Sequence, residues 1–121
     1  MDELVSRIVA KVGVDKVAAE KSVGIILDFL LKEGPADKVQ ALIAKIPGAE
    51  AFLKAQQAGD AGGGMFSMGI MGAGTKMMAA GLSMGQVQGV TKEVIAYTRE
   101  KIGEDAIGEI VGAIPGLSQF I

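Results

Sequence analysis

The positions of apolar residues along the chain predict a series of helices. In residues 2–12, apolar side chains recur every three or four positions, which is the period of one helix face. Gly13 ends this helix, and Asp15 is suited to cap a second helix that runs to about Glu33. Within the second helix, residues 23–31 (VGIILDFLL) are apolar on nearly every side, so we expect it to be the buried central helix of the first half.

Further helices are predicted on both sides of a glycine-rich region. Pro35 suits the first turn of a third helix, and a short fourth helix is expected at about residues 49–57. Residues 83–86 (SMGQ) form a capping-box pattern that opens a long helix ending at about Ile102, and the last helix starts at Glu104. Because no stretch alternates convincingly with a period of two, the chain is predicted to be an all-α helical bundle.

One sequence motif occurs twice, at a constant offset of 68 positions. Residues 37–53 (DKVQALIAKIPGAEAFL) align without a gap with residues 105–121 (DAIGEIVGAIPGLSQFI), and both copies contain Ile-Pro-Gly. Since each copy of an internal repeat is one supersecondary unit, residues 39–46 and 107–114 should be matching helices. The residues expected to be buried together in one core are Leu42, Ile43, Ile110 and Val111.

The chain is therefore predicted to be a single helical domain, residues 1–121, made of two similar halves. Half one spans residues 2–57, half two spans residues 83–121, and a Gly/Met-rich linker and apolar segment occupies residues 58–82. A length of 121 residues suits one ordinary domain. Half of the residues are hydrophobic and only 4% are aromatic, so aliphatic and methionine side chains must fill the core.

The composition argues against most catalytic chemistries. The chain contains no Cys and no His, which removes the thiolate nucleophile, the imidazole base and the commonest zinc ligands. We therefore expect no enzymatic activity, no catalytic metal and no cofactor. A net charge of −2 gives no reason to expect nucleic-acid binding. The N-terminus opens with acidic residues and lacks a long apolar run, so we expect no signal peptide and a cytoplasmic location.

The apolar stretch of residues 65–82 carries a single charge, Lys76. Small monomers seldom expose a contiguous apolar patch above a few hundred Å², so we expect a second copy of the chain, or another protein, to cover this segment. The alternative is a membrane-surface protein whose segment 65–82 engages acyl chains, although glycines and Lys76 argue against a span. No small-molecule ligand is indicated. The residues expected at the interaction surface are Met65, Phe66, Met68, Met71, Met77 and Met78.

Two of these features have a chemical alternative. Met65, Met68 and Met71 are three positions apart and could bind Cu(I) through their thioethers, but packing is the favoured interpretation because no His or Cys accompanies them. Asp28 lies in an apolar run and could be a buried acid with a raised pKa. Its position four residues before Lys32 instead favours an ion pair on a solvated helix surface.

Glycines also recur four positions apart in two series. Their positions are 81, 85 and 89, and 108, 112 and 116. In a membrane helix this spacing marks close dimer packing, whereas in a soluble bundle it lets one helix backbone approach another, and the flanking charges favour the soluble case. Residues 62–64 are all glycine but lack the Gly-Lys-Ser/Thr ending of a P-loop at the required spacing, so no phosphate site is predicted.

The order of these segments resembles a known bacterial family. Residues 13–30 (GVDKVAAEKSVGIILDFL) and 36–53 (ADKVQALIAKIPGAEAFL) precede the Gly-rich linker, and a second half follows that starts LSMGQVQGV at Leu82. Together with Ile-Pro-Gly at positions 46–48, this layout resembles the VcgC/VcgE-like bacterial domains of unknown function, which are small two-repeat helical proteins. The likeness covers residues 14–121. It implies the helical fold and supplies no catalytic residues.

Overall fold

The computed structural model describes residues 2–46, 48–51, 53–54 and 77–114. The helices are α1 (Asp2–Val12), α2 (Lys16–Glu33), α3 (Ala36–Lys45), α6 (Met84–Ile102) and α7 (Glu104–Ala113). Residues 49–51, 53–54 and 77–79 are also helical. No strand occurs in this described part of the chain, which confirms the prediction of an all-α fold.

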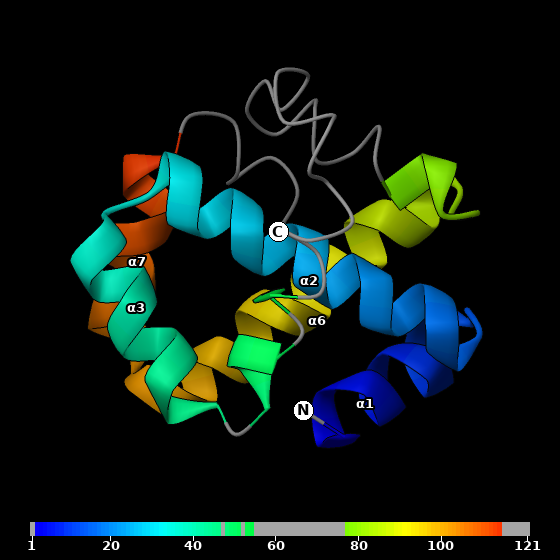
Figure 1. Ribbon diagram of the computed structural model, residues 1–121, viewed down its shortest axis with the longest axis horizontal. Coiled ribbons are helices and arrows are strands. Elements are labelled where there is room, and N and C mark those ends of the chain that lie inside the picture. The colour runs from blue at the N-terminus through cyan, green and yellow to red at the C-terminus, as the bar shows by residue number, and fades with distance from the viewer. Residues whose placement is uncertain (1, 47, 52, 55–76, 115–121) are drawn as a thin grey trace.

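Two long helices, α2 and α6, cross at the centre of the molecule (Figure 1). α3 and α7 lie together at one end of its longest axis, and α1 lies at the other end with residues 77–83. α1 packs on both long helices, α3 packs on both long helices and on α7, and α7 packs on α6. Each shorter helix therefore depends on the central pair for its position.

α2 is buried on every side along its middle section. All residues from Ser22 to Leu30 are buried, as expected of a helix that is apolar nearly all round. α1 is buried on one face only, through Leu4, Val5 and Ile8. The contrast follows from the sequence, since α1 carries charged residues on its outer face, whereas residues 22–30 of α2 contain a single charge, Asp28.

Local capping signals set the starts of the two long helices. The Ala18 N–H donates a hydrogen bond of 3.0 Å to Asp15 Oδ1 at the start of α2. At the start of α6, the Ser83 N–H donates to Gln86 Oε1 (2.9 Å) and the Gln86 N–H donates to Ser83 Oγ (3.3 Å), which is the predicted capping box. Pro35 precedes α3 as its N-cap, in extended conformation, rather than lying in its first turn.

Corresponding helices start 68 positions apart, both for α2 and α6 and for α3 and α7. The C-cap residues Ile46 and Ile114 have nearly equal backbone angles, φ −107° and ψ 107° against φ −109° and ψ 108°. The links that precede α3 and α7 differ in length. Gly34 and Pro35 join α2 to α3, whereas Gly103 alone joins α6 to α7. The spacing of the helices therefore equals the offset of the sequence motif.

The apolar faces of α3 and α7 enter the core as predicted, except at one residue. Leu42, Ile43 and Ile110 are buried. Val111 is only partly buried, so the prediction that it shares their burial is wrong. The inward row of α7 passes through Ile110, and Val111 lies beside that row at the edge of the core.

Asp28 is buried, with a relative exposure of 3%. The interpretation of this residue as solvated surface is therefore wrong, because α2 has no solvent face at this level. The predicted pair is observed, since Asp28 Oδ2 lies 3.0 Å from Lys32 Nζ. Lys32 is itself exposed, so its long side chain brings a surface charge to a buried carboxylate.

The glycine series allow close helix packing at one position among those that the structure describes. A Cβ at Gly89 would lie 3.2 Å from Val12 Cγ2, so α1 approaches α6 closely there. Four other glycines of these series face open space, where an added Cβ would meet no atom within 4 Å: Gly81, Gly85, Gly108 and Gly112. The prediction of close backbone approach is wrong for these four. Gly116 lies outside the described residues.

We expect Leu42→Ala or Ile110→Ala to lower the free energy of unfolding by about 2–5 kcal/mol, because each change leaves a cavity among fully buried side chains. Gln40→Ala changes an exposed position of α3 and should alter stability by less than about 0.5 kcal/mol. Denaturant titration followed by circular dichroism measures all three variants. Core variants that are as stable as the control would contradict this packing.

Candidate interaction surface

Of the residues predicted at an interaction surface, the structure describes Met77 and Met78. Met77 is 2% exposed and belongs to the core of the chain, whereas Met78 is 47% exposed. The other predicted residues lie outside the described part of the chain: Met65, Phe66, Met68 and Met71. Among the described residues of the predicted surface, Met78 is therefore the one that is exposed.

Residues 77–85, which we name the second corner, turn the chain into α6. Gly81 has φ 106° at this turn, a conformation that favours glycine. Leu82 follows it and is buried, which anchors the turn to the core. Met84, the first residue of α6, is 48% exposed, so exposed methionines both precede and follow the turn in sequence. Met84 is not among the residues predicted at the interaction surface, because the capping-box motif that contains it does not indicate exposure. The absence of charged residues from residue 77 to residue 91 is the sequence feature that could have indicated an apolar surface there.

Residues 9–17, which we name the first corner, connect α1 to α2. Gly13 has φ 85° and lies 68 positions before Gly81, and the cap residue Asp15 lies 68 positions before Ser83. Both corners lie at the same end of the molecule, the right-hand end in Figure 1. Among the described residues, the exposed large hydrophobic side chains all belong to these two corners: Val9, Val17, Met78 and Met84.

A groove with a volume of about 310 Å³ opens beside the first corner. It is lined by Val5, Ser6, Val9 and Ala10 of α1 and by Lys16 of α2. The four α1 residues lie on adjacent turns of one helix face. The lining is therefore apolar apart from one hydroxyl and one ammonium group, and the small side chain of Ala10 leaves space within it.

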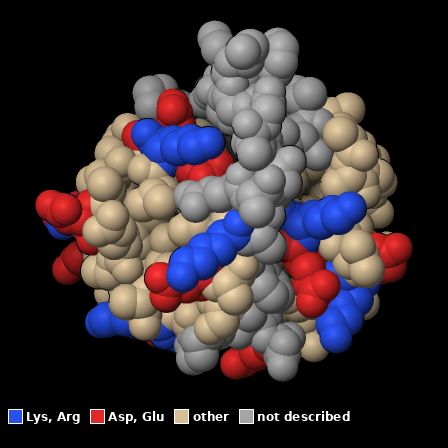
Figure 2. Space-filling model, viewed as in Figure 1, with Lys and Arg blue, Asp and Glu red and all other residues tan. Residues whose placement is uncertain are grey.

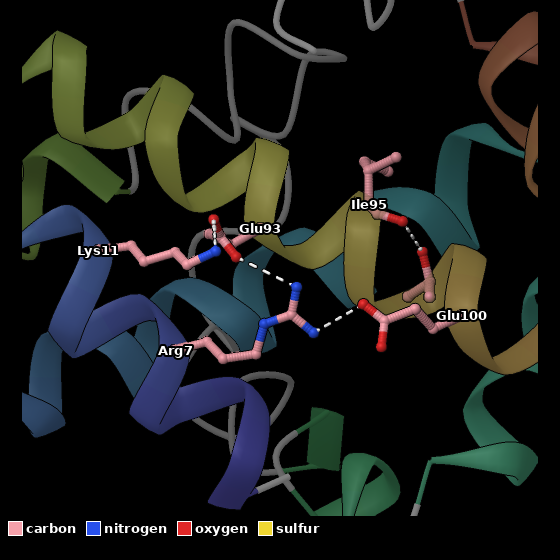
Figure 3. A network of polar contacts seen from close by, with 6 residues as sticks. Arg7, Lys11, Glu93, Ile95 and Glu100 are labelled. Carbon is pink, nitrogen blue, oxygen red and sulfur yellow. Dashed lines mark hydrogen bonds and ion pairs between the residues drawn. The ribbon is translucent and has the colours of Figure 1, made fainter.

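A network of charged side chains holds α1 against α6 (Figure 3). Arg7 Nη1 donates a hydrogen bond of 2.9 Å to Glu100 Oε2, and Arg7 Nη2 lies 3.5 Å from Glu93 Oε2. Lys11 Nζ lies 3.8 Å from Glu93 Oε1. The guanidinium carbon of Arg7 is also 5.8 Å from the centre of the Tyr97 ring, within the range of cation–π attraction. A single arginine of α1 thus contacts two successive turns of α6.

Glu93 is the member of this network that depends most on Arg7. Its Oε2 atom is buried and makes no hydrogen bond with the described residues, so the nearby guanidinium charge compensates it. The hydrogen bond to Glu100, helped by the charges of Glu100, Glu93 and Glu3, raises the pKa of Arg7 despite its partial burial. A raised pKa in the folded state stabilises the fold at every pH below the pKa of the unfolded arginine. This stabilisation is lost only in strongly alkaline solution, so Arg7 does not act as a switch near neutral pH.

Acidic and basic side chains are interspersed over the described residues on the face shown in Figure 2. That pattern differs from the single-sign field that attracts nucleic acid over a distance. In the part of the chain that the structure describes, no helix combines the length and apolar character needed to cross a membrane. The same residues contain no cluster of three or more side chains with carboxylate, imidazole or thiol groups suited to a metal ion.

Comparison with protein-family models, with curated proteins and with solved structures gave no match to the chain. The resemblance to VcgC/VcgE-like domains therefore stays a prediction.

We expect Arg7→Gln to lower the free energy of unfolding by about 1–3 kcal/mol, because it removes the guanidinium charge beside the buried Glu93 Oε2 and leaves Lys11, 3.8 Å from Oε1, as the remaining cation of this network. Lys38→Gln is the matched control. It breaks the more exposed ion pair between Lys38 and Glu109 and should cost less than about 1 kcal/mol. Denaturant titration measures both changes.

Adding Glu93→Gln to the Arg7→Gln variant should recover part of the lost stability, since the side chain that lost its guanidinium partner is then neutral. Equal and small losses for Arg7→Gln and Lys38→Gln, with no recovery in the double variant, would show that the network does not hold α1 in place.

Proposed function

We propose that this protein is a non-enzymatic interaction module that binds a second copy of itself through the end of the molecule that carries the two corners. The observation that carries the proposal is the location of the exposed large apolar side chains, all of which belong to these corners among the described residues. Met78 and Met84 are each almost half exposed. Flexible thioether side chains suit a surface that repacks against a partner, and exposed apolar clusters often mark such surfaces.

The proposal includes an architecture of two related helical halves within one cytoplasmic domain. Equal spacing of the helix starts, equal backbone angles at Ile46 and Ile114, and N-caps 68 positions apart at Asp15 and Ser83 support this relationship. Two related halves would make the two corners counterparts of each other. Their occurrence at one end then gives a single surface with two similar parts.

A role in binding rather than catalysis is supported by the chemistry of the side chains. The chain has neither Cys nor His, and nucleophilic or acid–base catalysis most often employs these residues. The charged side chains of the α1–α6 contact pair with one another. These pairings favour a structural role for that cluster.

Binding to a membrane surface through the same end is a second candidate function. Residues 77–91 carry no formal charge, and Met78 and Met84 project from this stretch. Apolar side chains on such a surface can enter the boundary between lipid headgroups and acyl chains. Flotation of the protein with liposomes as a monomer would favour this candidate, whereas protein that stays out of the vesicle fraction would favour self-association.

We expect light scattering of the purified chain at micromolar concentration to give twice the mass of one chain. Replacing Met78 and Met84 together by Asp should raise the dissociation constant at least about tenfold, because two charges would have to be desolvated in the interface. Gln40→Asp places a charge on the exposed face of α3, at the other end of the molecule, and should leave the dissociation constant unchanged. A strictly monomeric parent chain would overturn the proposal.

A further inference from the structure

The two corners differ in their side chains at corresponding positions, in size at one position and in charge at another. At the offset of 68 positions that separates the two copies of the sequence motif, the groove residue Ala10 corresponds to Met78. The groove residue Lys16 corresponds to Met84 at the same offset. The first corner therefore has a small side chain beside an open groove. The second corner has long apolar side chains at the same positions, and they project into solvent.

The groove and the exposed methionines match in polarity, and the groove has space for an unbranched side chain. The groove has about 310 Å³ of space and a mainly apolar lining, and methionine is unbranched and adapts to irregular apolar spaces. Met78 and Met84 are 47% and 48% exposed, so neither of them is enclosed by its own chain. Each copy thus presents both an apolar hollow and apolar projections at one end.

Charge also permits this pairing. Lys16 is the charged residue of the groove lining and forms no ion pair with the described residues. The stretch that would face it, residues 77–91, carries no charge. Within residues 77–91, a second corner placed on the groove would therefore bring no charge toward Lys16, and the aliphatic part of the lysine side chain could pack on a thioether.

We propose that Met78 and Met84 of one copy insert into the groove beside the first corner of a second copy, and that the same contact is made in return. This inference rests on the self-association proposed above and specifies how the two surfaces meet. Because the two corners lie at the same end of each chain in Figure 1, a two-fold axis at that end would bring each corner of one copy onto the other corner of its partner. The result is a closed dimer rather than a growing filament.

Disulfide trapping tests this arrangement directly, because the chain has no cysteine of its own. Two single-cysteine variants, Ala10→Cys and Met78→Cys, are made with tags of different mass, mixed and gently oxidised. A disulfide requires the two Cα atoms to lie within about 7 Å. We expect the yield of the disulfide that joins position 10 to position 78 to be at least about tenfold higher than the yield of either homodisulfide. A tenfold excess corresponds to a free-energy preference of about 1.4 kcal/mol for this contact.

Two further variants serve as controls. Ser6→Cys replaces another groove residue and should also form a disulfide with Met78→Cys, so the test does not depend on one substitution. Ala44→Cys lies on an exposed position of α3, at the far end of the molecule, and should form almost none. Circular dichroism of each reduced variant checks that it is folded before oxidation.

The outcomes separate this inference from the proposal on which it rests. If the parent chain is a dimer by light scattering but homodisulfides predominate, or no disulfide forms between the groove and position 78, then the methionines do not occupy the groove and this inference is wrong. Self-association itself would still stand in that case. If the parent chain is a monomer at every concentration, both proposals are overturned.

Discussion

The crossing of α2 and α6 is the contact on which the other helices depend. α2 has no solvent-facing side from Ser22 to Leu30, so it is stable only where other helices cover it. Buried hydroxyl groups could weaken this contact, but Thr91 and Thr98 each donate a hydrogen bond of 2.9 Å to a carbonyl of their own helix. Ser22 likewise donates to Ala18 O at 2.7 Å. Since these polar groups are satisfied within each helix, the contact between the two helices can rest on apolar packing.

The ion pairs at the two ends of this central pair join different helices: α3 to α7 at one end, and α1 to α6 at the other. At one end, the apolar rows of α3 and α7 are buried, with fully buried residues on both helices at Leu42 and Ile110. At the other end, α1 adds charged contacts to its apolar face through Arg7, Glu93 and Glu100. These contacts fix α1, which carries most of the groove lining, against α6. A groove on a helix that is fixed in this way keeps one shape, which lowers the cost of ordering it on binding.

Most helix boundaries could be predicted from the sequence, because capping groups act over a few residues. The hydrogen bonds of Asp15 and of residues 83–86 each span three positions. The burial of Asp28 could not be predicted in this way, since periodicity shows which side of a helix a residue occupies and not whether solvent reaches that side. Arg7 and Glu100 are 93 positions apart, and the groove depends on how α1 packs near the start of α2. No local pattern encodes either of these tertiary features.

The links between the long and short helices differ in composition, yet the distance from the start of α2 to the start of α3 equals that from α6 to α7, at 20 residues. One position in the link between α2 and α3 has a counterpart that is the last helical residue of α6. The end of the long helix therefore differs between the two pairs, whereas the number of residues between the helix starts is the same. Each residue turns an α-helix by about 100°. Insertion or deletion of one residue between the starts would therefore rotate the apolar row of the following helix out of the core. The side chains in these links are free to diverge as long as their number is kept.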